Sequence, residues 1–221
     1  MTELTADMAS AMIHAASVRV AATAGELSRL DAVAGDGDHG VNMAAAFATA
    51  DGSVASEAPT DVADVFRLVG QVFEESGSGS AGALFGAYFE TLGLRLRGAP
   101  TAEATDVVAA LHAATDRVAD IGRARLGDKT MLDALRPAVD AARAAADAGA
   151  SLESVMSAAR DAAVAGAEST AGMAAKAGRA RYARDGAIST RDPGAVTIAV
   201  MFEAWADALR PQRAQAMKAT P

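Results

Sequence analysis

The chain has 221 residues, no cysteine and a formal net charge of −8 at pH 7. Because cysteine is absent, disulfides, thiolate metal sites and cysteine nucleophiles are excluded. The acidic balance argues against a nucleic-acid-binding surface, which would be basic overall or carry a dense basic stripe. Hydrophobic residues make up 51% of the chain and aromatic residues only 4%, which predicts a sizeable core of closely packed small side chains.

Signals for membrane insertion or secretion are not found in the sequence. The first ten residues, "MTELTADMAS", include two acids and no basic residue, so a secretory signal is not expected. No stretch of about 18 apolar residues, the length that a membrane-spanning helix needs, is free of charge. We therefore expect a soluble cytoplasmic protein with neither a membrane partner nor a nucleic-acid partner.

Helical periodicity of apolar residues runs along most of the chain. Val62, Val65, Phe66, Val69 and Phe73 fall on one face of a helix, for example. The periodicity and the start signals before it predict eight helices, near residues 3–24, 41–50, 62–73, 82–97, 107–118, 130–147, 151–163 and 195–209.

The ends of these helices also carry sequence signals. Ser151 is the expected N-cap of the seventh helix. The segment "AVTIAVMF" (195–202) is compatible with a strand, but Trp205 and Leu209 continue it at helical spacing up to Pro211. The breaks between helices are short and rich in glycine, at 35–40, 77–82, 122–128 and 186–194. With no long linker or repeat, the sequence predicts a single all-α domain over residues 1–221.

The first of these breaks is the most acidic. In "AGDGDHGVNM" (34–43) Asp36 and Asp38 are two residues apart, on the same side of an extended backbone, and Asp31 lies just upstream. Three carboxylates suit a hard cation such as Mg²⁺. An EF-hand is excluded, because its sixth position would be Val41 rather than glycine and its twelfth Phe47 rather than an acid. A solvated acidic turn that caps the next helix remains the alternative.

Three other breaks are candidates for binding phosphate. "ESGSGSAGALFG" (75–86) could offer backbone N–H groups at a helix start, although flexible connectors have the same composition. "GRARLGDKTM" (122–131) is close to a P-loop, but Asp128 alters the spacing and no strand precedes it; Asp128 and Thr130 are then helix caps. "KAGRARYARDGAISTRDPGA" (176–195) contains five basic residues before a helix start, which indicates either a solvated face or an anion site.

Five segments in this order resemble a known family. They are "LDAVAGDGDHGVNM", "GALFGAYF", "GDKTMLDALRPAV", "GRARYARDG" and "DPGAV". Together they are similar, over nearly the whole chain, to the nucleotide-binding L subunit of dihydroxyacetone kinase. The resemblance implies a barrel of eight antiparallel helices with the nucleotide at one end, in agreement with the helix count.

The resemblance also implies a set of site residues. Asp31, Asp36 and Asp38 would hold two Mg²⁺ ions that bridge the phosphates of ATP or ADP. The nucleotide would be lined by His39, Gly40, Val41, Asn42, Ser80, Ala81, Gly122, Thr130, Met131, Arg179, Asp192, Pro193 and Gly194. Phosphoryl transfer needs positioning and electrostatics rather than a side-chain nucleophile, so no catalytic side chain is assigned, and His14 and His112 are expected simply to lie on helices.

The implied function is that of half an enzyme. The chain would transfer a phosphoryl group to dihydroxyacetone, or to a similar small ketose such as erythrulose, held by a separate K subunit. The donor would be ATP, or tightly bound ADP that an M subunit of the phosphotransferase system recharges. The alternatives are a nucleotide-dependent protein that signals to a transcription regulator, and a helical scaffold whose site has decayed.

The sequence departs from the family pattern at two places. Ala81 stands where the family usually has serine, so a hydroxyl contact to the nucleotide would be lost while a backbone N–H contact would survive. Arg181, Arg184 and Gly186 stand where serine, glycine and arginine are more frequent. The basic loop around Arg179 is therefore rearranged relative to the family pattern.

Overall fold

Eight α-helices form the computed structural model, which describes residues 3–98, 100–183 and 187–210. They are α1 (Ala6–Asp31), α2 (His39–Glu57), α3 (Val62–Glu75), α4 (Gly79–Arg95), α5 (Ala104–Gly122), α6 (Leu132–Asp147), α7 (Leu152–Ser169) and α8 (Pro193–Ala208). Two short 3₁₀ helices, η1 (Thr170–Gly172) and η2 (Arg179–Tyr182), lie between α7 and α8. The predicted all-α fold is confirmed.

Several helices begin where the sequence carries a capping residue. The side chains of Thr5, Asp61, Ser151 and Asp192 each accept a backbone N–H from the first turn of α1, α3, α7 and α8. Such a cap satisfies one of the N–H groups that a helix start leaves without a partner. The predicted cap at Ser151 is thus confirmed.

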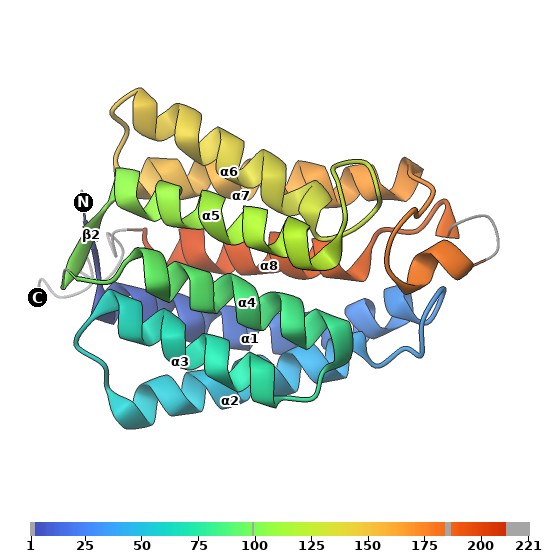
Figure 1. The fold of residues 1–221 in the computed structure, drawn as a ribbon, viewed down its shortest axis with the longest axis horizontal. Coiled ribbons are helices and arrows are strands. Elements are labelled where there is room, and N and C mark those ends of the chain that lie inside the picture. The colour runs from blue at the N-terminus through green and yellow to red at the C-terminus, as the bar shows by residue number, and fades with distance from the viewer. Residues whose placement is uncertain (1–2, 99, 184–186, 211–221) are drawn as a thin grey trace, which may run out of the picture.

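The helices close into a ring. Each helix packs against the next one in the chain, and α8 packs against both α7 and α1. Consecutive helices run antiparallel, as Figure 1 shows. The up-and-down order places four connections at one end of the barrel: 32–38, 76–78, 123–131 and 170–192. These segments overlap the glycine-rich breaks of the sequence, whose remaining residues lie in the adjoining helix turns.

The opposite end of the barrel holds a small antiparallel sheet that the sequence analysis did not predict. Strand β1 (Glu3–Thr5) pairs with β2 (Thr101–Glu103), with Leu4 opposite Ala102. The expected first helix, near 3–24, instead begins at Ala6 and extends to Asp31. The prediction was wrong at both ends. At the first end the reason is strand pairing, which depends on a partner almost a hundred residues away that local periodicity does not reveal.

The few aromatic side chains gather in the core between α2, α3, α4 and α8. Neighbouring ring centroids are 5.0–6.4 Å apart. The cluster contains every phenylalanine together with one tyrosine and the tryptophan: Phe47, Phe66, Phe73, Phe85, Tyr88, Phe89, Phe202 and Trp205. The buried residues of α6 and α7 are instead alanines and aliphatic side chains for the most part. Among the described helices, none is both long enough and apolar enough to cross a bilayer.

Candidate functional site

The four glycine-rich connections surround a cavity of about 370 Å³ at their end of the barrel. This volume lies in the usual range for small-molecule sites. Most of the predicted site residues line it: Asp31, His39, Ser80, Ala81, Gly122, Thr130, Met131, Arg179, Asp192, Pro193 and Gly194. One wall is apolar and includes Leu84, Val118 and Ile121. The cavity therefore combines an apolar surface with the starts of α4 and α8.

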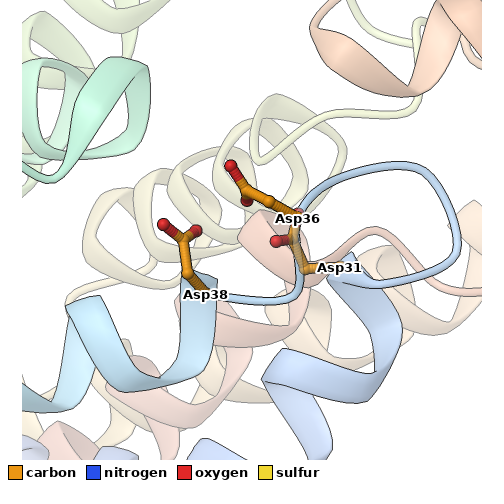
Figure 2. Close-up of side chains that lie close together, drawn as sticks. All are labelled: Asp31, Asp36 and Asp38. Carbon is orange, nitrogen blue, oxygen red and sulfur yellow. The ribbon is translucent and has the colours of Figure 1, made fainter.

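Three carboxylates lie together at this end. Each of Asp31, Asp36 and Asp38 offers one oxygen, and these oxygens lie within 4.8 Å of one another. Figure 2 shows Asp31 at the end of α1, Asp36 in the connection and Asp38 at the start of α2. Because carboxylate oxygens are the donors that a hard cation prefers, the three residues fit the predicted Mg²⁺ site.

The connection that carries these carboxylates is a turn rather than the extended segment that the sequence suggested. Gly37 has a φ of +77°, in the left-handed region that glycine adopts at little cost. The Asp31 carboxylate stabilises the turn, since its Oδ2 accepts the N–H of Gly37 at 3.0 Å and that of His39 at 3.4 Å. The turn folds Asp36 and Asp38 back toward the end of α1.

Arg179 brings the basic segment to these carboxylates. Its Nη1 donates to Asp36 Oδ2 at 2.5 Å, and its Nη2 lies 3.9 Å from Asp38 Oδ1. The hydrogen bond from Arg179 lowers the pKa of Asp36, and the same bond raises the pKa of Arg179. All three side chains are more than half exposed, so a ligand or a cation can reach them.

The other basic side chains of this segment are directed elsewhere. Arg191 forms ion pairs with Glu26 and Glu168. Arg181 lies over the ring of Tyr182, with its guanidinium carbon 4.6 Å from the ring centroid. Two of the rearranged positions, Arg184 and Gly186, lie outside the described residues. Arg179 is thus the described arginine of the segment that contacts the acidic cluster.

His39 joins the starts of α2 and α8. The Thr197 hydroxyl donates to the Pro193 carbonyl at 2.9 Å, so it accepts a hydrogen bond from His39 Nε2, also at 2.9 Å. Burial lowers the pKa of His39, although Asp31 and Asp38 act in the opposite direction. The imidazole is therefore neutral at pH 7 and carries its proton on Nε2.

Asp192 caps α8 where that helix meets the cavity. Its Oδ2 accepts the N–H of Ala195 at 2.7 Å. Burial raises the pKa of Asp192 to about 7; the Ala195 bond opposes the rise, and the Asp133 carboxylate adds to it. A carboxyl group that is partly protonated near neutral pH repels an anionic ligand less than an ionised one, so the cap is compatible with phosphate at this helix start.

Three predicted nucleotide residues, all in the first turn of α2, do not line the cavity. Gly40 is buried against α1, where a Cβ atom would lie 1.9 Å from the Ala24 carbonyl oxygen. Val41 is 64% exposed, and Asn42 faces a separate groove beside α3. Gly40 therefore has a packing role that allows α2 to approach α1 closely and place Asp38 beside Asp31.

Two site residues were missed by the sequence analysis. Asp133 accepts the N–H of Gly127 at 2.6 Å and that of Thr130 at 2.8 Å, and so shapes the connection before α6. Lys129 lines the cavity and is only 2% exposed. Asp128 is not the predicted helix cap, because its carboxylate accepts the N–H of Arg125 within the connection. Thr130 accepts the N–H of Leu132, the first residue of α6, although the N-cap position of that helix is Met131.

The fold and site together define an all-α barrel with a carboxylate cluster and a ligand-sized cavity at one end. Within this class, the chain belongs to the DAK2 domain family, which matches residues 33–207. The family suggested by the five sequence segments is thereby confirmed. The match begins after Asp31 and ends within the last turn of α8.

Named relatives are kinases or kinase subunits. The chain is 37% identical to L-erythrulose 1-kinase of Mycolicibacterium smegmatis, over 81% of this chain and 31% of the relative. It is 30% identical to the ADP-binding subunit DhaL of the PEP-dependent dihydroxyacetone kinase of Escherichia coli, over 80% of this chain and 84% of that subunit. It therefore spans about a third of the first relative and most of the second.

A solved structure has the same fold. The dihydroxyacetone kinase from C. freundii, crystallised in complex with AMP-PNP and Mg²⁺, superposes with a TM-score of 0.71 at 30% sequence identity. The similarity covers 94% of this chain and 35% of that enzyme. The barrel described above is thus found as one part of a longer kinase.

Proposed function

We propose that this chain is the nucleotide-binding part of a dihydroxyacetone-type kinase. It would bind Mg²⁺ with ATP or ADP in the cavity and supply the phosphoryl group for a small ketose, dihydroxyacetone or a tetrulose such as erythrulose. The observation that carries this proposal is a cluster of three carboxylates with Arg179 at the end of the barrel where Asp31, Arg179 and the starts of α4 and α8 line one cavity. The names of the relatives support the reaction class and leave the ketose open.

The described residues suggest how the nucleotide would be held. Asp31, Asp36 and Asp38 would hold two Mg²⁺ ions, which neutralise phosphate charge when bound. Backbone N–H groups at the starts of α4 and α8, near Ala81 and Gly194, would donate to phosphate oxygens. The apolar wall would contact the base, because flat aromatic ligands bury well against aliphatic side chains.

The acceptor would be held by a separate K subunit. A small, well-hydrated ketose offers little contact area, so it needs a dedicated pocket to be aligned with the γ-phosphate. The chain spans about a third of the erythrulose kinase and of the C. freundii enzyme, which supports an acceptor site outside it. Whether ATP or a phosphotransferase-system M subunit renews the donor is a further part of the proposal to test.

The surface around the cavity is suited to such a partner. Five exposed apolar side chains lie on the elements at this end, and we call them the apolar rim: Val33, Val41, Leu126, Tyr182 and Ile188. Exposed apolar groups beside a polar site are typical of protein interfaces. The rim supports docking of the K subunit over the mouth of the cavity.

A reconstituted kinase assay tests the proposal. The chain with Mg²⁺, ATP and dihydroxyacetone or erythrulose should show no turnover alone and robust turnover when a K subunit is added. Asp36→Asn should abolish that turnover. In a parallel arm, ATP is replaced by phosphoenolpyruvate and the phosphotransferase proteins to identify the donor. Turnover by the lone chain would contradict the half-enzyme proposal, and nucleotide binding without turnover in any mixture would favour the signalling alternative.

A further inference from the structure

Lys129 is a buried cation in the connection between α5 and α6. Its Nζ donates to the Thr170 carbonyl at 2.6 Å and also to the Thr190 carbonyl. Thr170 begins η1 after α7, and Thr190 lies just before α8. A single ammonium group therefore joins the connection between α5 and α6 to two separate points of the connection between α7 and α8.

Other hydrogen bonds strengthen the same junction. The Asp192 N–H donates to Thr170 Oγ1 at 2.9 Å, and the Lys176 N–H donates to the Asp128 carbonyl at 3.0 Å. Thr130 follows Lys129 in the chain, and Asp192 lies close after Thr190. Both Thr130 and Asp192 line the cavity. The junction thus forms part of the cavity lining, since Lys129 and Thr190 line the cavity beside Thr130 and Asp192.

The backbone conformation of Lys129 indicates that its side chain is required at this position. Its φ is +59°, in the left-handed region that favours glycine and is unfavourable for lysine. Strained residues of this kind persist where the surrounding structure requires them, often at functional sites. Glycine would fit this backbone with less strain but would supply no ammonium group.

We infer that Lys129 is a positioning residue that holds the walls of the cavity together, and not a phosphate ligand. This inference rests on the proposed nucleotide site. The sequence "GDKT" invites comparison with a phosphate-binding lysine, but the Lys129 ammonium is buried and donates to two carbonyl groups. By fixing Thr170 and Thr190, it sets the distance between Thr130 on one wall and Asp192 on the other.

Lysine reactivity in the unmodified protein separates the two roles. Amine acetylation, read by mass spectrometry, would compare Lys129 with the exposed Lys176. We expect Lys129 to react at least about tenfold more slowly than Lys176, with or without Mg-ADP, because a buried amine reacts only after local opening. Fast labelling of Lys129 that Mg-ADP suppresses would overturn the inference and indicate a phosphate ligand.

Two substitutions then test positioning. Lys129→Met removes the ammonium group, and Lys129→Gly removes it while relieving the backbone. Calorimetry should show Mg-ADP binding weakened at least about tenfold in both, at temperatures where circular dichroism shows the helices intact. Hydrogen exchange should become faster in residues 123–131 and 187–192. Arg143→Met, which removes an exposed positive charge from α6, should change neither quantity.

The outcomes distinguish this inference from the proposed function. If the unmodified protein binds no Mg-ADP, the proposed nucleotide site is wrong. If it binds Mg-ADP and Lys129→Gly binds within about threefold of it, the site stands and the positioning role is wrong. A lower melting temperature with unchanged affinity would also overturn positioning, since it would show a role in stability alone. Should Lys129→Met fail to fold, Lys129→Gly decides the question.

Discussion

Asp36, Asp38 and Arg179 place positive and negative charge side by side at an exposed point. The Arg179 guanidinium lies between two carboxylates that also fit a divalent cation. Without a bound cation, the like charges of the three carboxylates repel one another, and Arg179 offsets only part of this repulsion. We therefore expect metal and nucleotide to bind together, with Arg179 free to turn toward phosphate once a metal ion neutralises the carboxylates.

Removing one carboxylate of the cluster should reduce the rise in melting temperature that bound nucleotide causes. Mg-ADP should raise the melting temperature of the unmodified protein by several degrees, because a ligand that binds only the folded state stabilises it by mass action. Asp38→Asn should lose more than about half of that shift, since one of three metal ligands is gone. Differential scanning fluorimetry measures both. Asp140→Asn, an exposed change on α6, serves as control, and an undiminished shift in Asp38→Asn would rule out the metal site.

His39 should make the folded state sensitive to acid. Since burial lowers its pKa below the ordinary 6.5, the unfolded chain takes up this proton at a higher pH than the folded protein. The contribution of neutral His39 is thus complete above about pH 6.5 and is lost as the pH falls through that value. His39→Gln, which retains a donor for Thr197, lacks this titration.

The comparison is made by urea unfolding at several pH values. At about pH 8 the unmodified protein should be more stable than His39→Gln by about 1 kcal/mol, because glutamine keeps the donor but fills the buried site of the imidazole less well. This difference should shrink between about pH 7 and pH 5. A difference that stays constant over that interval would show that His39 does not titrate in the way its burial implies.

At the scale of elements, the contact between α1 and α2 positions the acidic cluster. Gly40 lets the first turn of α2 approach Ala24 of α1, and the 32–38 connection then has to reverse within a short distance. Asp31 and Asp38 flank that connection, so their separation follows from how closely the two helices pack. Helix α2 contains a second glycine, Gly52, with open space around it.

Gly40 and Gly52 form a matched pair for substitution. Gly40→Ala should destabilise the protein by about 1–3 kcal/mol, the usual cost of forcing extra atoms into a packed contact, and should weaken Mg-nucleotide binding. Gly52→Ala should stabilise it by about 0.5–1 kcal/mol, because alanine loses less backbone entropy in a helix. Urea unfolding and calorimetry measure these effects. Equal changes in the free energy of unfolding and in nucleotide affinity for the two variants would contradict close packing at Gly40.

At the scale of the whole molecule, closure of the ring brings connections distant in sequence to one end. Asp36 and Arg179 are 143 residues apart and share a hydrogen bond there. The same end carries the apolar rim. Among the described residues, two other large apolar side chains are more than half exposed, Val18 and Leu94, and both lie on helix surfaces away from this end. One end of the barrel therefore combines the site with the surface suited to a partner.

The rim can be tested apart from the nucleotide site. Leu126→Asp should raise the concentration of K subunit needed for half-maximal turnover at least about fivefold, because a charge placed in an apolar interface is costly to bury. Its affinity for Mg-ADP should be unchanged. Leu94→Asp, an equivalent change near the C-terminal end of α4, should alter neither. Titrating K subunit in the kinase assay measures the effect, and equal titration curves for the two variants would show that the rim is not the docking surface.

Local patterns were sufficient to predict most of the secondary structure and the breaks at which the candidate site lies. Apolar periodicity indicated eight helices, and glycine with acidic or basic residues marked the breaks where the site lies. The limits of the helices were less accurate: α2 begins and ends outside the expected 41–50, and α1 reaches Asp31. These ends depend on packing partners as well as on the local sequence.

The sequence by itself determined which segments are helices, where the chain turns and which charged side chains the turns carry, because these follow from propensity and spacing along the chain. Only the tertiary structure decided that β1 pairs with β2, that Gly40 serves packing rather than lining the cavity, and that Lys129 is buried. Each of these depends on groups brought together by ring closure. A local pattern carries no information about a neighbour far away in the chain, and so the roles of these residues became visible only in the closed barrel.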